Sequence, residues 1–149
     1  MQDITNYAKI VIPAYSKNEG LARMFVSSFA SQLDPTIEEI NDIKAAVSEA
    51  VTNSIVHGYC NKIGDITILL RILGSDTLYI KISDKGIGIP DIKKAMEPLF
   101  TTSPEGERAG LGFAVMESFT DKIRVTSKVG KGTSVTLLKR LNGRHEQTD

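Results

Sequence analysis

The stretch that decides the fold reads Val47-Ser-Glu-Ala-Val-Thr-Asn-Ser-Ile-Val-His-Gly58. Apolar residues recur at three- and four-residue steps through this stretch and through the residues before it, which predicts a helix with one buried face. We expect the helix to cover residues 37–57. Thr36 and Glu39 offer a capping box at its start, and Gly58 is placed to end it.

A second side of the predicted helix carries Glu49, Asn53 and His57. Side chains four residues apart lie close to one line along a helix, because each residue turns the helix by ~100°. An acid, an amide and an imidazole in one line indicate a wall of a polar site. A solvated helix face is the alternative interpretation of this stretch alone, so other segments must distinguish the two.

Composition limits the class of protein. The chain has 149 residues, 41% of them hydrophobic and 24% charged, which is typical of one globular domain. Its 18 basic and 18 acidic residues give no surplus for general nucleic-acid binding. The single cysteine, Cys60, excludes an internal disulfide and suits a reducing compartment. No apolar run approaches the ~20 residues that a membrane helix needs, and the N-terminus lacks signal-peptide features. We therefore expect a cytoplasmic protein.

The remaining segments predict a β-α-α-β-β-lid-α-β-β order. We expect strands at residues 7–14, 65–73, 77–83, 122–128 and 133–141, and further helices at 17–33, 91–96 and 112–119. Strand pairs joined by tight turns favour an α+β two-layer sandwich, with a mixed, mostly antiparallel sheet and its helices on one face. Residues 1–149 are expected to form a single domain, with a core at about 7–141 and a lid at about 90–110.

The helix predicted at residues 17–33 has a capping box in Ser16 and Glu19. Its core stripe is expected from residues that follow the helical period, namely Leu21, Met24 or Phe25, Ser28 and Phe29. This leaves Glu19 and Arg23 on the other side. They are candidates for partner contact, or else an ordinary surface pair at i,i+4.

Three glycine-bearing segments could serve a ligand, although each is weak by itself. Asp84-Lys-Gly86-Ile-Gly88 follows a predicted strand, where an aspartate can accept from an exocyclic amine and glycines allow close approach to a flat ring. Gly110-Leu-Gly112 precedes a helix, where exposed N–H groups suit phosphate oxygens. Gly130-Lys-Gly132-Thr133 is first of all a hairpin turn. Simple turns and a plain helix start are the alternatives.

Together, Glu49-x-x-x-Asn53, Asp84-x-Gly86-x-Gly88, Gly110-x-Gly112 and Gly130-x-Gly132-Thr133 resemble the motifs of the GHKL ATPase/kinase superfamily. The resemblance covers about residues 7–141 and implies the Bergerat ATP-binding fold. Within the superfamily, Ser48-Glu-Ala-Val-Thr-Asn-Ser-Ile-Val-His-Gly-Tyr59, with Ser31-Gln-Leu-Asp-Pro-Thr36 upstream, is similar to the sporulation anti-sigma factors, which are serine kinases of endospore-forming bacteria.

The resemblance implies roles for the polar residues of the phosphate end. Asn53 would supply an amide oxygen to a Mg²⁺ ion that bridges the ATP phosphates. Glu49 would accept the proton of the attacking serine hydroxyl. Arg108, in the lid, would neutralise charge on the γ-phosphate. Gly110 and Gly112 would present backbone amides to the phosphates.

The resemblance also implies the residues of the adenine end. Asp84 would accept from the adenine amino group, with Gly86 and Gly88 leaving space beside the base. Thr133 would make a second contact on the adenine side. His57 continues the line of Glu49 and Asn53 and is a candidate for the nucleotide site, or else packs near the end of the helix.

Two coupled activities follow from this resemblance. The protein would bind and inhibit an RNA polymerase sigma factor, and it would use ATP to phosphorylate a serine of the anti-anti-sigma factor, leaving ADP. Relatives of this kind are homodimers. The alternatives are a nucleotide-gated binding module for a different sigma factor without phosphate transfer and, third, a simple ATPase. The presence of both Glu49 and Asn53 favours the kinase, because a binding module needs the metal ligand but not the base.

Overall fold

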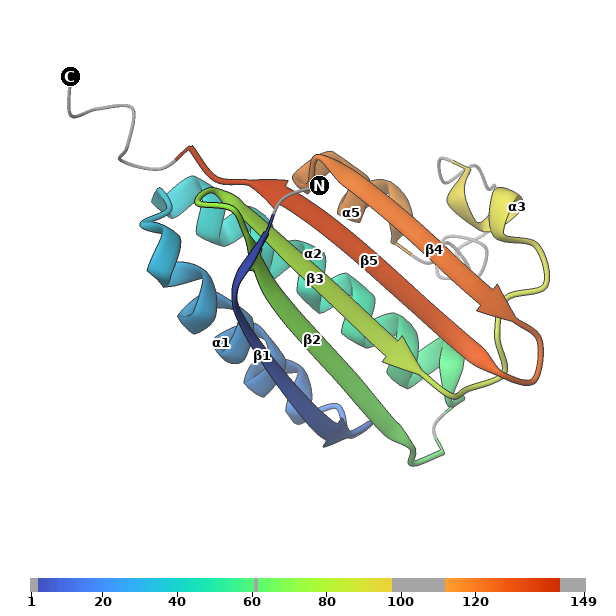
Figure 1. Ribbon diagram of the computed structural model, residues 1–149. Helices are drawn as coiled ribbons and strands as arrows, with labels where there is room; N and C mark the ends of the chain where they lie inside the picture. The colour runs from blue at the N-terminus through green and yellow to red at the C-terminus, as the bar shows by residue number, and fades with distance from the viewer. Residues whose placement is uncertain (1–2, 61, 98–111, 143–149) are drawn as a thin grey trace, which may run out of the picture.

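The computed structural model describes residues 3–60, 62–97 and 112–142 (Figure 1). The strands are β1 (Ile4–Pro13), β2 (Asp65–Leu73), β3 (Thr77–Asp84), β4 (Lys122–Lys128) and β5 (Gly132–Arg140). The helices are α1 (Asn18–Ala30), α2 (Ile37–Thr52), α3 (Ile92–Met96) and α5 (Phe113–Phe119), with a 3₁₀ turn at Ser31–Leu33 and a π-helical turn at Asn53–Gly58. The described residues contain no helix that is both long enough and apolar enough to span a membrane.

The five strands form one sheet in the order β1-β2-β3-β5-β4, and every neighbouring pair is antiparallel. Figure 1 shows α1, α2 and α5 together behind this sheet. The predicted α+β two-layer fold is confirmed. Because β5 lies beside β3, residues far apart in sequence meet at the end of the sheet, where Asp84 is opposite Thr133.

The core lies between the sheet and α2. Strands β2 and β3 alternate between buried and partly exposed residues, as a sheet covered on one face requires. Their fully buried side chains include Ile68, Leu70 and Ile80, and α2 contributes Ile43 and Val47 to the same cluster. Helix α2 is therefore fixed against the middle of the sheet.

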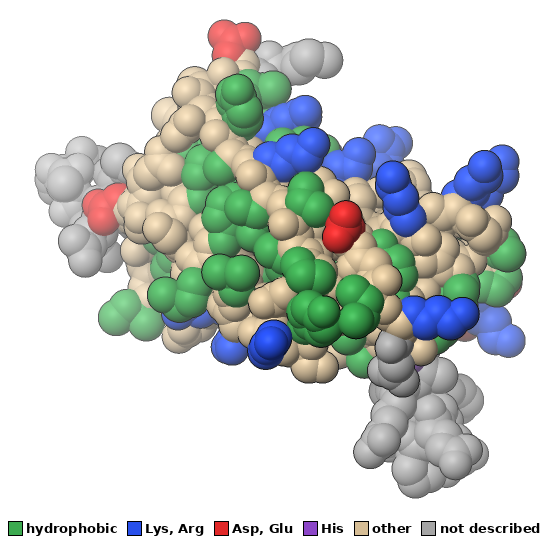
Figure 2. All heavy atoms as spheres, turned by 90° about the horizontal axis from the view of Figure 1, so that it is seen from below, with side chains coloured by type: hydrophobic (Ala, Val, Ile, Leu, Met, Phe, Trp, Pro, Cys, Tyr) green, Lys and Arg blue, Asp and Glu red, His purple; other side chains and the backbone are tan. Residues whose placement is uncertain are grey.

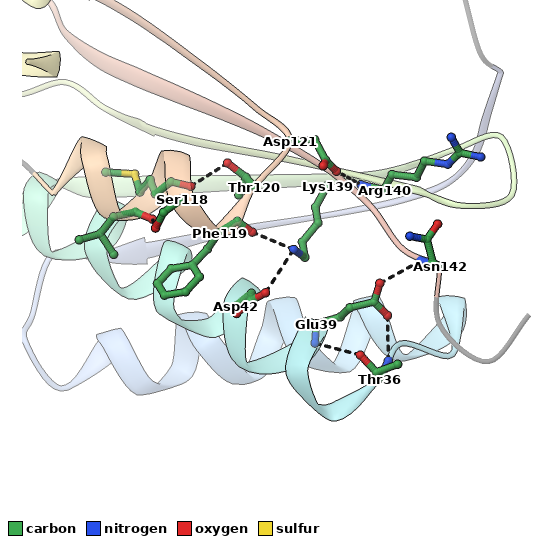
Figure 3. Close-up of polar contacts among 12 residues, drawn as sticks. Thr36, Glu39, Asp42, Ser118, Phe119, Thr120, Asp121, Lys139, Arg140 and Asn142 are labelled. Atoms are coloured by element: carbon green, nitrogen blue, oxygen red, sulfur yellow. Dashed lines mark hydrogen bonds and ion pairs between the residues drawn. The ribbon is translucent and has the colours of Figure 1, made fainter. Parts of the chain in front are cut away.

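The predicted capping box opens α2 and also contacts the last described residues (Figure 3). The backbone N–H of Glu39 donates to Thr36 Oγ1 at 3.1 Å, and the backbone N–H of Thr36 donates to Glu39 Oε1 at 2.9 Å. The other carboxylate oxygen of Glu39 accepts from the N–H of Asn142 at 2.9 Å. Nearby, Lys139 Nζ lies 3.5 Å from Asp42 Oδ2.

Helix α1 corrects two sequence predictions. It begins at Asn18 without a side-chain cap, so Ser16 and Glu19 do not form the predicted capping box. Its buried residues are Ala22, Val26, Phe29 and Ala30, whereas Leu21 is 52% exposed, Met24 is 62% exposed and Ser28 is also exposed. Apart from Phe29 the buried residues of α1 are small or of medium size, and larger apolar side chains such as Leu21 and Met24 remain on the surface.

Candidate functional site

The end of α2 is a π-helical turn, where the sequence predicted a regular helix to residue 57. The N–H of Tyr59 donates to the carbonyl of Ser54 at 2.9 Å, an i→i+5 bond. Such wide turns often mark functional sites. Four residues of this turn, Asn53, Ser54, His57 and Gly58, line the same cavity.

This cavity lies between the π-helical turn, the segment after β3, and β5, and has a volume of about 280 Å³. Its polar lining includes Asn53, Ser54, His57, Asp84 and Thr133. Its apolar lining includes Ala50, Ile87, Ile89, Phe113 and Val135. Mostly apolar walls with a few polar groups are typical of small-molecule sites.

Asp84 is the buried polar centre of the cavity. Its side chain is 9% exposed, and it accepts hydrogen bonds on both oxygens. Oδ1 accepts from the backbone N–H groups of Gly86 at 2.9 Å and Thr133 at 3.3 Å, and Oδ2 accepts from Ser54 Oγ at 2.8 Å. An ionised carboxylate has about four acceptor positions and no donor. Oδ2 can therefore accept one more hydrogen bond, and a ligand amine is one donor that suits it.

The glycines after Asp84 have a structural reason besides the predicted one. A Cβ on Gly86 would lie 2.1 Å from the carbonyl oxygen of Gly58, and a Cβ on Gly88 would lie 2.3 Å from the carbonyl oxygen of Lys128. The space at both positions is thus occupied by backbone, although Gly88 also lines the cavity. These glycines hold the segment against its neighbours.

Glu49 lies beside the start of α5. Gly112, the residue before this helix, has φ +68°, and a Cβ there would lie 2.2 Å from Glu49 Oε2. Glu49 is not among the residues that line the cavity. However, Ala50, which follows Glu49, and Phe113, which follows Gly112, both line it. The carboxylate is therefore placed at the rim of the cavity. Arg108 and Gly110, the other predicted phosphate contacts, lie outside the described residues.

Sequence reasoning missed Ser54 and Ser127. Ser54 lies at a position that fits the apolar helical stripe, but its hydroxyl donates to Asp84 Oδ2 at 2.8 Å. Ser127 Oγ lies 2.8 Å from Thr133 Oγ1 and accepts from the N–H of Ile89 at 2.7 Å, so it connects two walls of the cavity. A small polar residue at a core position is the signal that could have identified Ser54.

The metal-ligating groups at the cavity fit a metal ion that arrives with a nucleotide. In the described ranges, no group of three or more His, Cys, Asp and Glu side chains could hold a metal. Asn53 lines the cavity and carries one amide oxygen. Mg²⁺ often uses one or two protein oxygens and takes its other ligands from water and phosphates. A single amide is therefore suited to Mg²⁺ bound to phosphates.

Comparison with known proteins supports this interpretation of the fold. The family described as "Histidine kinase-like ATPase domain" matches residues 12–139. The chain is 53% identical to the Anti-sigma F factor of Clostridium acetobutylicum and 56% identical to that of Thermoanaerobacter sp., each over 137 residues, 92% of this chain and 95% of the relative. The Anti-sigma F factor of Geobacillus kaustophilus is 47% identical over 136 residues, 91% of this chain and 93% of the relative.

Solved structures share the fold at low sequence identity. The RsbU and RsbW domains of Rv1364c from Mycobacterium tuberculosis align with a TM-score of 0.66 and 21% identity, covering 92% of this chain and 32% of that one. The mycobacterial sensor histidine kinase MprB aligns with a TM-score of 0.57 and 16% identity, covering 91% and 99%. The chain belongs to the histidine kinase-like ATPase family and, within it, to the family of the anti-sigma F factors.

Proposed function

We propose that this protein is an anti-sigma factor and a protein serine kinase of the cytoplasm. It binds and inhibits the sporulation sigma F factor, and it uses Mg-ATP to phosphorylate a serine of the anti-anti-sigma factor. The observation that carries the proposal is the cavity at Asp84. A buried acceptor lies there between apolar walls, Asn53 lines the same cavity, and Glu49 lies at its rim. The identity of about 50% to proteins named Anti-sigma F factor supports the choice of partner.

The adenine base occupies the apolar part of the cavity. Its amino group donates to the free acceptor position on Asp84 Oδ2, and its faces pack against side chains such as Ile87 and Phe113. Thr133 lies beside Asp84, because its own N–H donates to the same carboxylate. Binding of ATP and ADP at this end is the same, since the two nucleotides share the base.

The phosphates extend toward Asn53 and Glu49. Asn53 would hold the Mg²⁺ ion, which would neutralise charge on the phosphates. The serine oxygen attacks the γ-phosphorus, the bond from that phosphorus to the bridging oxygen of ADP breaks, and Glu49 accepts the hydroxyl proton. Arg108 is assigned to the γ-phosphate, Gly110 and Gly112 to backbone contacts with the phosphates, and His57 to the same part of the cavity.

The partner surface is assigned to α1 and β1. Arg23 Nε lies 3.2 Å from Glu19 Oε1, so the two residues form the i,i+4 pair on the surface. The neighbouring Leu21 and Met24 are more than half exposed, as is Val11 on β1. Figure 2 shows hydrophobic side chains gathered over the middle of the face seen from below, with lysine and arginine side chains around them. Charged residues around exposed apolar ones suit a protein interface.

A second candidate is a nucleotide-gated binding module for another sigma factor, without phosphate transfer. It needs the cavity but not the base, and it is favoured by the fact that Glu49 lies at the rim of the cavity and does not line it. In both candidates we expect a homodimer, which light scattering of the purified protein would detect.

Phosphate transfer distinguishes the two candidates. ATP labelled on the γ-phosphate is mixed with Mg²⁺, this protein and the anti-anti-sigma factor, and label on a substrate serine is measured. We expect transfer by the wild type and by Glu38→Gln, an exposed acid on the same helix, but not by Glu49→Gln or Asn53→Ala. ATP binding without transfer to an authentic partner would contradict the kinase and leave the binding module.

A further inference from the structure

Tyr59 directly follows the π-helical turn and lies outside the nucleotide cavity. Its ring is half-buried and packs on Gly64, where a Cβ would lie 2.2 Å from the ring. Its backbone N–H closes the π-helical turn by donating to Ser54. The ring is therefore held between the end of the site helix and the residues that lead into β2.

The Tyr59 hydroxyl joins three segments. It donates to the carbonyl of Asp65, at the start of β2, and accepts from the N–H of Lys85 at 2.8 Å, directly after β3. Both functions of the hydroxyl are used. The end of the site helix is thereby connected to the segment that carries Asp84.

The N–H groups that follow Asp84 are all held in place. That of Lys85 donates to Tyr59, that of Gly86 donates to Asp84 Oδ1 at 2.9 Å, and that of Ile87 donates to the carbonyl of Gly58 at 2.9 Å. The hydrogen bond from Lys85 to Tyr59 is the first of these three after β3 ends. Its acceptor is a side chain that follows the π-helical turn. Asp84 and Ile87, which line the cavity, lie on either side of it.

We propose that Tyr59 is a positioning residue of the nucleotide site. Its hydroxyl fixes the backbone at Lys85 so that Asp84 and Ile87 keep the geometry that receives the base. This inference rests on the proposed function, because it assigns the cavity to a nucleotide. Lys85 is exposed, so water can replace the lost partner when the hydroxyl is removed. The main effect of its removal is therefore a less ordered site, which must be ordered again when the ligand binds.

The test compares Tyr59→Phe with Thr5→Val. The first variant keeps the ring and removes only the hydroxyl. The second removes a hydroxyl that donates to the carbonyl of Gly74 at 2.9 Å, in a different turn of the sheet. ADP affinity is measured by calorimetry, and amide hydrogen exchange at Lys85 and Ile87 by NMR. We expect Tyr59→Phe to weaken ADP binding about fivefold to tenfold and to speed exchange at both amides, while Thr5→Val changes neither.

A purely structural role for Tyr59 would lower the melting temperature of Tyr59→Phe and leave its ADP affinity at the wild-type value, and this result would overturn the inference. Gly64→Ala provides a second route, because its methyl group displaces the ring and its hydroxyl together; we expect a similar loss of ADP affinity. If the wild type itself does not bind ADP, the proposed function fails and the inference fails with it. If the wild type binds ADP and both Tyr59→Phe and Gly64→Ala bind it equally well, the inference is overturned while the proposed function stands.

Discussion

Asp84→Asn exchanges one acceptor for a donor while leaving the shape of the site unchanged. The amide oxygen can keep the two bonds from the N–H groups of Gly86 and Thr133, at 2.9 and 3.3 Å. The amide nitrogen takes the place of Oδ2, 2.8 Å from Ser54 Oγ, and the serine hydroxyl rotates from donor to acceptor. Every internal hydrogen bond survives in a neutral form, so we expect the variant to fold with only a small loss of stability.

The effect on the ligand is much larger. The amino group of adenine now meets an N–H group, so a hydrogen bond to a charged acceptor is lost and two donors face each other. Together these cost about 2–4 kcal/mol, a loss of about 30-fold to 1000-fold in affinity. An inosine nucleotide carries a carbonyl at the same position and can accept from the new amide. We therefore expect Asp84→Asn to bind IDP at least as tightly as ADP.

Calorimetric titration of wild type and Asp84→Asn with ADP and with IDP measures this reversal, and thermal melting checks that both proteins are folded. A folded Asp84→Asn variant that binds ADP as tightly as the wild type would refute the assignment of Asp84 to the base. A loss of affinity for both nucleotides, without any relative gain for IDP, would refute the proposed contact with the amino group.

Three further outcomes follow from the same geometry. Gly112→Ala places a methyl group against Glu49 at a positive φ, so we expect phosphate transfer to fall at least tenfold and by a larger factor than ADP affinity; equal loss of both would contradict this. Glu39→Ala removes the capping box and the contact with Asn142, and we expect the free energy of unfolding in urea to fall by about 1–2 kcal/mol, against little change for the exposed Glu38→Ala. Burial raises the pKa of the Tyr59 hydroxyl, with smaller contributions in the same direction from nearby carboxylates and an opposing one from the Lys85 N–H. Because the folded state holds this proton more tightly than the unfolded state, the contribution of Tyr59 to the free energy of unfolding is complete below about pH 10 and is lost as the pH rises above that value. Urea unfolding at pH 9 to 11 should therefore show a free energy of unfolding that declines less steeply with pH for Tyr59→Phe than for the wild type.

The elements of the fold could be predicted because local patterns specify them. The alternation in β2 and β3, the turn between them and the capping box at Thr36 and Glu39 each follow from neighbouring residues, and the structure confirms them. The buried side of α1 could not be predicted in this way. Which residues of a helix are buried depends on how its neighbours pack against it, and here Ala22 and Val26 are buried while the larger Leu21 and Met24 are exposed.

The candidate site shows the same division. Asp84, Asn53 and Thr133 were predicted as site residues from the resemblance of their motifs, and all three line one cavity in the structure. The π-helical turn was not predicted, because no residue type distinguishes it from a regular helix. The contact of Ser54 with Asp84 and the position of Tyr59 could not be predicted either, because both depend on how the end of the helix packs against the residues around β3.

The most direct test of the nucleotide site is a crystal structure of the protein with Mg²⁺ and a non-hydrolysable ATP analogue. We predict that the adenine amino nitrogen lies about 3 Å from a carboxylate oxygen of Asp84, with the base between Ile87 and Phe113 and the phosphates directed toward Asn53. A base bound elsewhere, with the cavity at Asp84 unfilled, would contradict the account.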